Sequence, residues 1–267
     1  MNRLPTLFVS HGAPTYALEP GLAGAQLAAA AARLPRPEAV LVVSPHWMTT
    51  QPRVATTAQP QTIHDFGGFD PALYELSYPA PGHPELAGRA IDLLQAAGWA
   101  AQADPRHGLD HGAWVPLRHL YPQAEVPVFQ VSLPTSLTAA EALDYGAALA
   151  PLAGEGVLIV GSGSLTHNLY EFRVGEAQEA AYAREFQDWV RAAVTAGDGD
   201  RLAATLDIAP HARRAHPTAE HFLPLLVAWG AARPPLPVTV LAGGIVHGVL
   251  SMESYLFGTD LQGASVG

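Results

Sequence analysis

The sequence predicts a single α/β domain spanning residues 1–267, with a central mostly parallel or mixed sheet flanked by helices. Three observations predict this fold class. Short β-branched runs alternate with helical stretches, no repeat or linker divides the chain, and 267 residues with 49% hydrophobic content can bury one large core. In such sheets the loops at the carboxyl ends of the strands carry polar side chains into a common crevice. We therefore expect the active site at that edge.

Three of the predicted strands end shortly before a histidine. The three strands are "TLFVS" (6–10), "AVLVVS" (39–44) and "VLIV" (157–160). His11 and His46 follow the first two strands closely, and His167 lies beyond a tight turn predicted at 161–163. Because the carboxyl ends of parallel strands meet at one edge of a sheet, we expect these three side chains to lie close together.

The remaining elements follow from periodicity. Apolar residues three and four apart predict helices, and further β-branched runs predict strands. The helices are predicted at 22–34, 84–97, 176–194 and 222–229, and the strands at 126–133, 238–241 and 245–252. Thr218 is the predicted N-cap of the last helix, which places His221 in the first turn, where Pro224 is tolerated.

The composition excludes several classes of function. With 24 acidic and 14 basic residues the formal net charge is −10, so we expect no binding to nucleic acid or to anionic lipid. No apolar stretch has the roughly 18 residues of a membrane helix, and the first residues do not form a signal peptide. The absence of cysteine excludes disulfides and thiolate metal sites and fits a cytoplasmic protein.

The convergence of His11, His46 and His167 predicts a metal site, because neutral imidazole is the commonest nitrogen ligand and no thiolate competes with it. A single histidine is more often a hydrogen-bonded or surface residue, and we expect His83 and His119 to be of that kind. Other motifs fail: "GSGSLT" lacks the third glycine of a dinucleotide fingerprint, and there is no nucleophile elbow, phosphate-binding loop or HExxH helix.

Two loops offer further polar side chains near this edge. The stretch "TIHDFGGFD" (62–70) combines His64 and Asp65 with two glycines, a composition suited to a mobile cover over a pocket. In "GLDHGAWVPL" (108–117), His111 precedes a helical stretch. Asp110 before it is equally well explained as the cap of that helix or as a catalytic group.

Seven short motifs occur in a characteristic order along the chain. They are "SHGAP" (10–14), "SPHW" (44–47), "IHDFGGF" (63–69), "YPAPG" (78–82), "DHGAW" (110–114), "THNL" (166–169) and "PTAEHFLPLL" (217–226). Together they resemble the class III extradiol ring-cleavage dioxygenases of the LigB superfamily, and most closely the 4,5-DOPA dioxygenase extradiol-like subgroup. The resemblance runs from about residue 6 to about residue 255. Ala13 departs from the subgroup, in which serine is common after the glycine.

The resemblance implies a set of metal ligands. His11 and His46 would bind the metal, and His221 would take the position at which protocatechuate-type relatives have a glutamate ligand. His167 would serve as the acid/base, or would approach the metal as a fourth ligand in zinc-loaded members. Three neutral imidazoles leave a site more positive than two imidazoles and a carboxylate, which favours binding of a catecholate.

The resemblance also implies the reaction and its participants. His167, His111 and His64 would be the catalytic residues around the substrate. The implied cofactor is Fe(II) in the active form, with Zn(II) as an alternative occupant of the isolated protein. The implied substrates are O2 and a catechol-type aromatic, DOPA-like or similar, which is opened to a semialdehyde. The subgroup suggests a monomer or a homodimer.

Two other functions stay open at this stage. Four imidazoles also suit Zn(II), which lowers the pKa of bound water, so a zinc-dependent hydrolase is the first alternative. A binding protein with a vestigial metal pocket is the second, although the complete histidine set argues against decay. The sequence does not determine the catechol, because the shape of the pocket depends on its loops. Four arginines are candidate partners for a substrate carboxylate, although ordinary surface charges are the favoured interpretation of each: Arg106, Arg118, Arg213 and Arg214.

Overall fold

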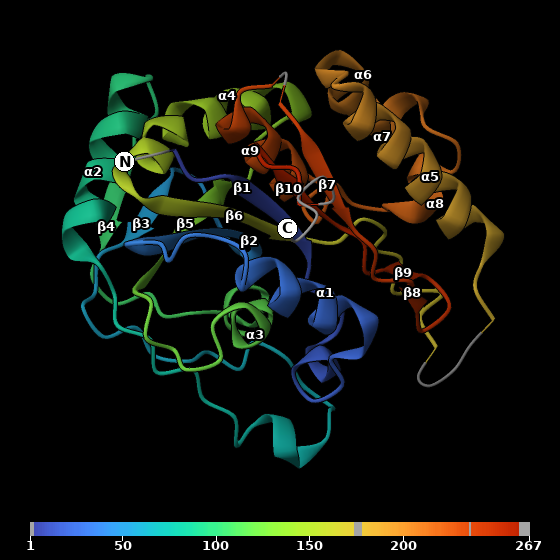
Figure 1. Cartoon of the computed structure of the whole chain (residues 1–267), viewed down its shortest axis with the longest axis horizontal. Helices are drawn as coiled ribbons and strands as arrows, with labels where there is room; N and C mark the ends of the chain where they lie inside the picture. Colours follow the sequence, from blue (N-terminus) through green and yellow to red (C-terminus); the bar gives the residue numbers. More distant parts are fainter. Residues whose placement is uncertain (1–2, 174–177, 235, 262–267) are drawn as a thin grey trace, which may run out of the picture.

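A mixed eight-stranded sheet forms the centre of the computed structural model, which describes residues 3–173, 178–234 and 236–261 (Figure 1). In spatial order the strands are β4 (Gln102–Asp104), β3 (Arg53–Ala55), β5 (Val128–Pro134), β2 (Ala39–Thr49), β6 (Val157–Gly163), β1 (Thr6–Ser10), β10 (Ser254–Phe257) and β7 (Val238–Leu241). The strands β5, β2, β6 and β1 are parallel, whereas β10 is antiparallel to both β1 and β7. The α/β fold with a mixed central sheet is therefore confirmed.

Helices cover both faces of this sheet (Figure 1). One face carries α1 (Gly21–Ala31) and α3 (His111–Leu120), and the other carries α2 (Pro84–Ala96), α4 (Ala139–Leu149), α5 (Ala181–Ala196) and α9 (Leu223–Ala232). The short helices α6 (Gly199–Ala203), α7 (Thr205–Ile208) and α8 (Ala212–Ala215) lead from α5 towards α9. Successive side chains of a strand point to opposite faces of the sheet. Val42 therefore belongs to the core on the side of α1 and α3, and Val43 to the core on the side of α4 and α9.

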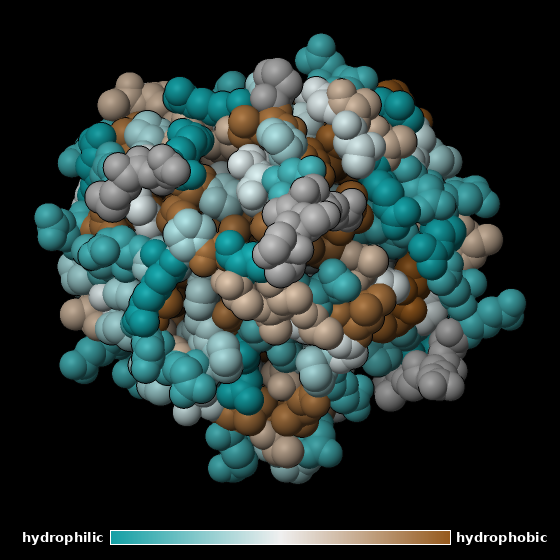
Figure 2. Space-filling model, in the orientation of Figure 1, coloured by the Kyte–Doolittle hydropathy of each residue, from teal (hydrophilic) through white to brown (hydrophobic). Residues whose placement is uncertain are grey.

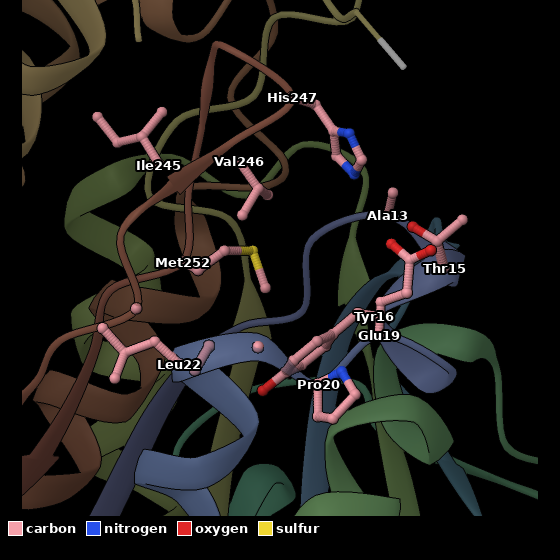
Figure 3. Close-up of a pocket in the computed structure, with 13 residues that line it drawn as sticks. Ala13, Thr15, Tyr16, Glu19, Pro20, Leu22, Ile245, Val246, His247 and Met252 are labelled. Carbon is pink, nitrogen blue, oxygen red and sulfur yellow. The ribbon is translucent and has the colours of Figure 1, made fainter. Parts of the chain in front are cut away.

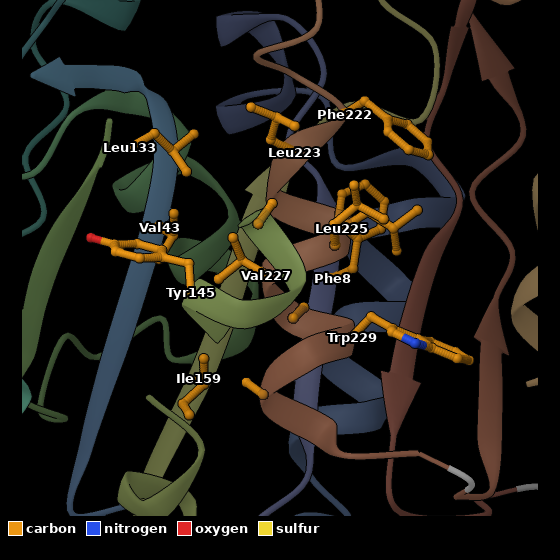
Figure 4. Packing of buried hydrophobic residues seen from close by; sticks show 14 of the residues in the cluster. Phe8, Val43, Leu133, Tyr145, Ile159, Phe222, Leu223, Leu225, Val227 and Trp229 are labelled. Atoms are coloured by element: carbon orange, nitrogen blue, oxygen red, sulfur yellow. The ribbon is translucent and has the colours of Figure 1, made fainter. Parts of the chain in front are cut away.

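The helix α9 is buried along its whole length, and it packs on β6 and β1 beside α4 (Figure 4). Its sequence is apolar on every side, as expected for a helix enclosed by other elements. Glycines allow this close approach. A Cβ on Gly161 of β6 would lie 2.0 Å from the carbonyl oxygen of Pro224, and one on Gly230 of α9 would lie 2.0 Å from that of Leu143.

Gly230→Ala is expected to destabilise the protein, because the added methyl group would collide with the backbone of α4. We expect a steric cost of about 3 kcal/mol, against about 1 kcal/mol gained from helix propensity. Urea unfolding of the apoprotein measures the difference. Gly88→Ala in α2 is the control, since nothing lies within 4 Å of its added Cβ. A Gly230→Ala protein as stable as the Gly88→Ala protein would show that α4 and α9 are not packed this closely.

Two predicted strand ends are wrong. The strand β2 continues through His46 to Thr49, with a register shift against β5 between Val43 and Met48. The strand β6 continues to Gly163, so there is no turn at 161–163. The glycines there serve close packing: a Cβ on Gly163 would lie 2.3 Å from the carbonyl oxygen of His221. Glycine in a strand interior often marks such an approach of another backbone.

The beginning of the last predicted helix is also corrected. The helix α9 starts at Leu223, so His221 precedes it instead of lying in its first turn, whereas Pro224 does lie in the first turn. Thr218 does not cap it, because its Oγ1 donates to Glu220 Oε1 at 2.9 Å. A side-chain carboxylate two residues away therefore replaces the expected backbone partner.

Other differences concern boundaries and short elements. The stretch 245–252 forms two short strands, β8 (Ile245–Val246) and β9 (Leu250–Ser251), joined by a turn in which His247 has a φ of 52°. The helix predicted at 176–194 begins at Ala181, and residues 176–177 lie outside the described residues. No periodicity argument had predicted β3, β4, β10, α4 or the helices α6 to α8. None of the helices in the described part of the chain is both long and apolar enough to cross a membrane.

Candidate metal centre

Histidines from separate parts of the chain meet at the carboxyl edge of the sheet. They line a cavity of about 310 Å³. The cavity is lined by His11, His46, His111, His167 and His221, with Gly12, Ala13, Pro14, Phe66, Gly67, Phe69, Leu169, Phe172 and Leu250. The structure thus brings together the side chains that the strand ends pointed to, and adds His221 from the segment before α9 and His111 from the start of α3.

His11, His46 and His221 form the centre of this cluster. Each ring offers one nitrogen, and the three nitrogens lie within 4.8 Å of one another. The Nε2 atoms of His11 and His46 are 3.1 Å apart, and Nε2 of His221 is buried without a hydrogen-bond partner among the described residues. Buried nitrogens that face one another without a polar partner are costly unless something binds them, so this arrangement fits a metal ion.

A hydrogen-bond chain defines the tautomer of His11. Ser162 Oγ donates its only proton to the carbonyl oxygen of Gly112. It can therefore only accept from His11 Nδ1, which lies 3.0 Å away. Nδ1 of His11 then carries the proton, and Nε2 presents its lone pair to the cluster. This division of roles between the two ring nitrogens is typical of a metal-binding histidine.

Carboxylates stand behind the other two rings. Glu220 Oε1 lies 3.0 Å from His221 Nδ1, and Asp65 Oδ2 lies 3.5 Å from His46 Nδ1. Each carboxylate favours a proton on Nδ1 and leaves Nε2 free for a metal. Sequence reasoning missed Glu220, although it directly precedes His221 and an acidic neighbour of a ligand is a usable signal.

Burial keeps these three imidazoles neutral. It lowers the pKa of His11 and of His221 well below the usual value, and mutual repulsion within the histidine cluster adds to the effect. Burial followed by repulsion from His111 lowers the pKa of His46 to about 3, although Asp65 opposes the shift. Neutral imidazole is the form that ligates metals. Three such nitrogens and no thiolate fit a divalent first-row metal ion.

His167 flanks the cluster without belonging to it. Its ring stacks on that of His221, with centroids 3.4 Å apart and planes inclined by 8°. One of its ring nitrogens lies within 4.8 Å of ligand atoms of Glu220 and His221, a second set of residues that could hold a metal ion, and this set does not include His11 or His46. Its backbone N–H donates to the carbonyl oxygen of Ala215, which holds the loop after β6 in place. Burial lowers the pKa of His167 to about 4.

His111 is the first residue of α3, and Asp110 caps that helix by accepting from the backbone N–H of Ala113. The capping interpretation of Asp110 is therefore correct. The same carboxylate is fully buried and also accepts from Ser44 Oγ at 2.8 Å and from Gln130 Nε2 at 2.7 Å. Burial raises the pKa of Asp110. These bonds tie the start of α3 to β2 and β5, which carry Ser44 and Gln130.

Asp65 joins His111 to His46. Its two oxygens accept from the backbone N–H and from Nδ1 of His111, each at 2.9 Å, while Oδ2 also faces His46. Burial alone would raise the pKa of Asp65, but the hydrogen bonds from His111 outweigh it and the pKa is lowered. The rings of His46 and His111 are 3.9 Å apart. One carboxylate on the 62–70 loop thus orients two rings of the site.

Several other candidates lie away from the cavity. Nε2 of His64 lies 2.9 Å from the carbonyl oxygen of Leu76, and its ring packs behind Phe66, so it is not among the lining residues. His83 caps α2 and His119 binds the carbonyl oxygen of Tyr16, as expected for structural histidines. The four arginines considered as carboxylate partners are also absent from the lining, and one of them, Arg214, pairs with Glu171.

Asp65→Asn is expected to weaken metal binding, because an amide cannot hold both Nδ1 protons as a carboxylate does. Loss of such an outer partner typically lowers metal affinity by about 10-fold to 100-fold. Competition with a chromophoric chelator measures the affinity for Zn(II) in the purified protein. Asp70→Asn, an exposed cap on the same loop, is the matched control and should bind as the original chain does. Equal affinities for the two variants would exclude a role of Asp65 at the metal.

Comparison with known proteins gives consistent matches over nearly the whole chain. A family model described as the catalytic LigB subunit of aromatic ring-opening dioxygenase matches residues 5–249. A Beta vulgaris protein named 4,5-DOPA dioxygenase extradiol is 40% identical over 96% of this chain and 97% of its own length, and one of that name from Escherichia coli is 38% identical over 96% of each. The crystal structure of an uncharacterized Escherichia coli protein superposes with a TM-score of 0.80 at 34% identity, covering 96% of this chain and 100% of that one.

Proposed function

Because the chain belongs to the family of the catalytic LigB subunit of aromatic ring-opening dioxygenase, we propose that it opens the ring of a catechol with O2 at Fe(II) held by His11, His46 and His221. The observation that carries the proposal is the convergence of three neutral imidazole nitrogens whose opposite nitrogens are engaged by Ser162, Asp65 and Glu220. The dioxygenase activity follows from the family. The metal, the substrate and the residue roles are our assignment.

The protein's own groups divide into ligands and supports. His11, His46 and His221 would hold the metal through Nε2, and Fe(II) supplies positions at which a catechol and O2 can meet. A ligand set of neutral imidazoles leaves the full positive charge of the ion to favour an ionised catechol oxygen. Phe66, Phe69 and Phe172 provide apolar walls suited to an aromatic ring.

His167 is assigned as the group that takes and returns the catechol proton. It lines the cavity beside His221, and no described residue occupies its ring nitrogens with a hydrogen bond. A neutral imidazole nitrogen can accept a proton from a hydroxyl within hydrogen-bond reach. His111 is held by Asp65 beside His46, where it can orient the substrate. His64 supports Phe66 from behind and is a positioning residue in this assignment.

The zinc-hydrolase alternative is not favoured, because the family and the similar named proteins are dioxygenases. The ligands do suit Zn(II), and the Irving–Williams order gives Zn(II) at least the affinity of Fe(II) at such a site. We therefore expect Zn(II) in protein isolated without iron. Such a sample should bind catechols without consuming O2.

Anaerobic reconstitution with Fe(II) tests the proposal. The iron-loaded protein is mixed in air with catechol, L-DOPA and protocatechuate, while O2 uptake and the absorbance of a yellow semialdehyde are recorded. We expect uptake with at least one catechol and none in the zinc-loaded control. Iron-loaded protein that consumes no O2 with any catechol would overturn the proposal and direct the next assays to esters and amides.

A further inference from the structure

A second and larger cavity lies next to the metal cavity. Its volume is about 620 Å³, against about 310 Å³ at the histidines. Figure 3 shows Ala13, Thr15 and Glu19 on one wall, with Ile245, Val246 and Met252 opposite. Figure 2 shows hydrophobic side chains at the surface over the region where Figure 1 places α1 beside the β8–β9 hairpin. The cavity is therefore an apolar recess that opens towards solvent beside the site.

Small and flexible side chains lie where the two cavities adjoin. Ala13 lines both of them. Met252 lines the larger one and lies so close to Gly12 of the metal cavity that a Cβ there would be 2.6 Å from Sδ. His247 lines the larger cavity, and its ring is 4.7 Å from that of Phe172 in the metal cavity. A methionine side chain adapts easily, so a substituent on a ring bound at the metal could extend past Ala13.

The larger cavity has polar atoms without partners. Among the described residues nothing bonds to Tyr16 Oη or to His247 Nδ1, and both atoms are buried. Figure 3 shows the two side chains approaching the cavity from opposite sides. Buried polar atoms are usually satisfied, and because these two have almost no accessible surface, a ligand in the cavity would reach them only after a shift of the Tyr16 or His247 side chain. A purely hydrocarbon occupant would leave them unpaired.

The formal charge of the larger cavity is negative. Glu19 is the one formally charged side chain among the lining residues, and no ion pair joins it to a described basic residue. The chain contains no lysine, and none of its arginines lines either cavity. Within the lining of this recess a carboxylate would meet only the repulsion of the exposed Glu19, whereas an ammonium group would meet its unpaired carboxylate.

We infer that the larger cavity is the subsite for the ring substituent of the substrate, and that Glu19 selects a substituent ending in an ammonium group over one ending in a carboxylate. The inference rests on the proposed function, because it assumes a catechol ring at the histidines. It narrows the substrate class to catechols with a cationic or neutral arm.

Three catechols with similar arms test the charge preference: dopamine, 4-propylcatechol and 3-(3,4-dihydroxyphenyl)propanoate. Binding is measured by calorimetry under argon on zinc-loaded protein, so that turnover does not intervene. A partly exposed carboxylate–ammonium pair changes affinity by up to about five-fold, and we expect about ten-fold between the amine and the acid because attraction and repulsion add. Equal affinities for the three arms would overturn the subsite alone. Failure of these and of unsubstituted catechol to bind would overturn the proposed function as well.

Variants then locate the effect. Glu19→Gln should reduce the ratio of the affinity for the amine to that for the acid to near one. Glu38→Gln should keep the original ratio, because Glu38 is exposed just before the start of β2, at the end of that strand away from His46. Leu22→Trp should fill the recess and weaken 4-propylcatechol relative to catechol by about five-fold. An unchanged ratio in Glu19→Gln would remove Glu19 from the subsite. Unchanged relative binding in Leu22→Trp would show that the arm does not enter the cavity.

Discussion

His46→Ala is expected to remove most of the bound metal and with it the ring-opening activity. His46 contributes one of three converging nitrogens, and its loss leaves the pair His11 and His221. Since loss of an outer partner already lowers metal affinity by about 10-fold to 100-fold, loss of a ligand should lower it by more than about 100-fold. Metal content after equal loading and dialysis is measured by atomic emission. Circular dichroism verifies that the variant is folded.

The control for this experiment is His64→Ala. His64 lies outside the cavity, with its Nε2 on the carbonyl oxygen of Leu76, so its removal should leave the metal content intact. Complete loss of metal in His64→Ala would show that the ligand set is wrongly assigned. Full retention of metal in His46→Ala would contradict the three-histidine centre directly.

His167→Ala is expected to retain substantial metal but to lose turnover, whereas His46→Ala should lose both. The ring of His167 flanks His221 instead of converging with the three ligand nitrogens. Removal of a general acid/base typically lowers the rate by about 10²-fold to 10⁴-fold. The measurement pairs metal content with the initial rate of O2 uptake in iron-loaded protein.

A second variant separates the proton role of His167 from its packing. His167→Phe retains an aromatic ring against His221 but has no nitrogen, so it should bind metal as well as His167→Ala or better and be equally inactive. Metal loss as large in the His167 variants as in His46→Ala would make His167 a fourth ligand and sink its assignment as the acid/base. An active His167→Phe would move the proton transfer to another group.

The local sequence pattern was sufficient for β1 and for the position of His11. A run of apolar residues ending at Ser10 has one plausible structure, a buried strand, and the following residue must then stand at the edge of the sheet. The same argument went wrong at β6, where Gly161 and Gly163 suggested a turn. These glycines are instead required by close packing: the backbones of Pro224 in α9 and of His221 just before it, more than fifty residues later in the chain, approach Gly161 and Gly163.

The candidate site, like the fold, could be predicted from the sequence only in part. Histidine is chemically distinctive, so His11 and His46 could be found as ligand candidates from residue type and position, whereas His221 was assigned through the resemblance to the family. Their supports could not be found in this way, because Ser162, Asp65 and Glu220 are ordinary polar residues whose meaning depends on which ring nitrogen they face. The position of His64 outside the cavity also depends on the fold of its loop, which brings its ring to 5.8 Å from that of Trp114.

Periodicity and side-chain type were sufficient to predict the fold class, the sheet edge at which histidines gather, and His11 and His46 as candidate ligands. The three-dimensional contacts were needed to show which nitrogen of His11 is free, that the ring of His167 stacks on that of His221, and that Glu19 lines a second cavity next to the first. Those features arise from contacts between distant segments. Their distances are set by the packing of helices and loops on the sheet, which no local pattern encodes.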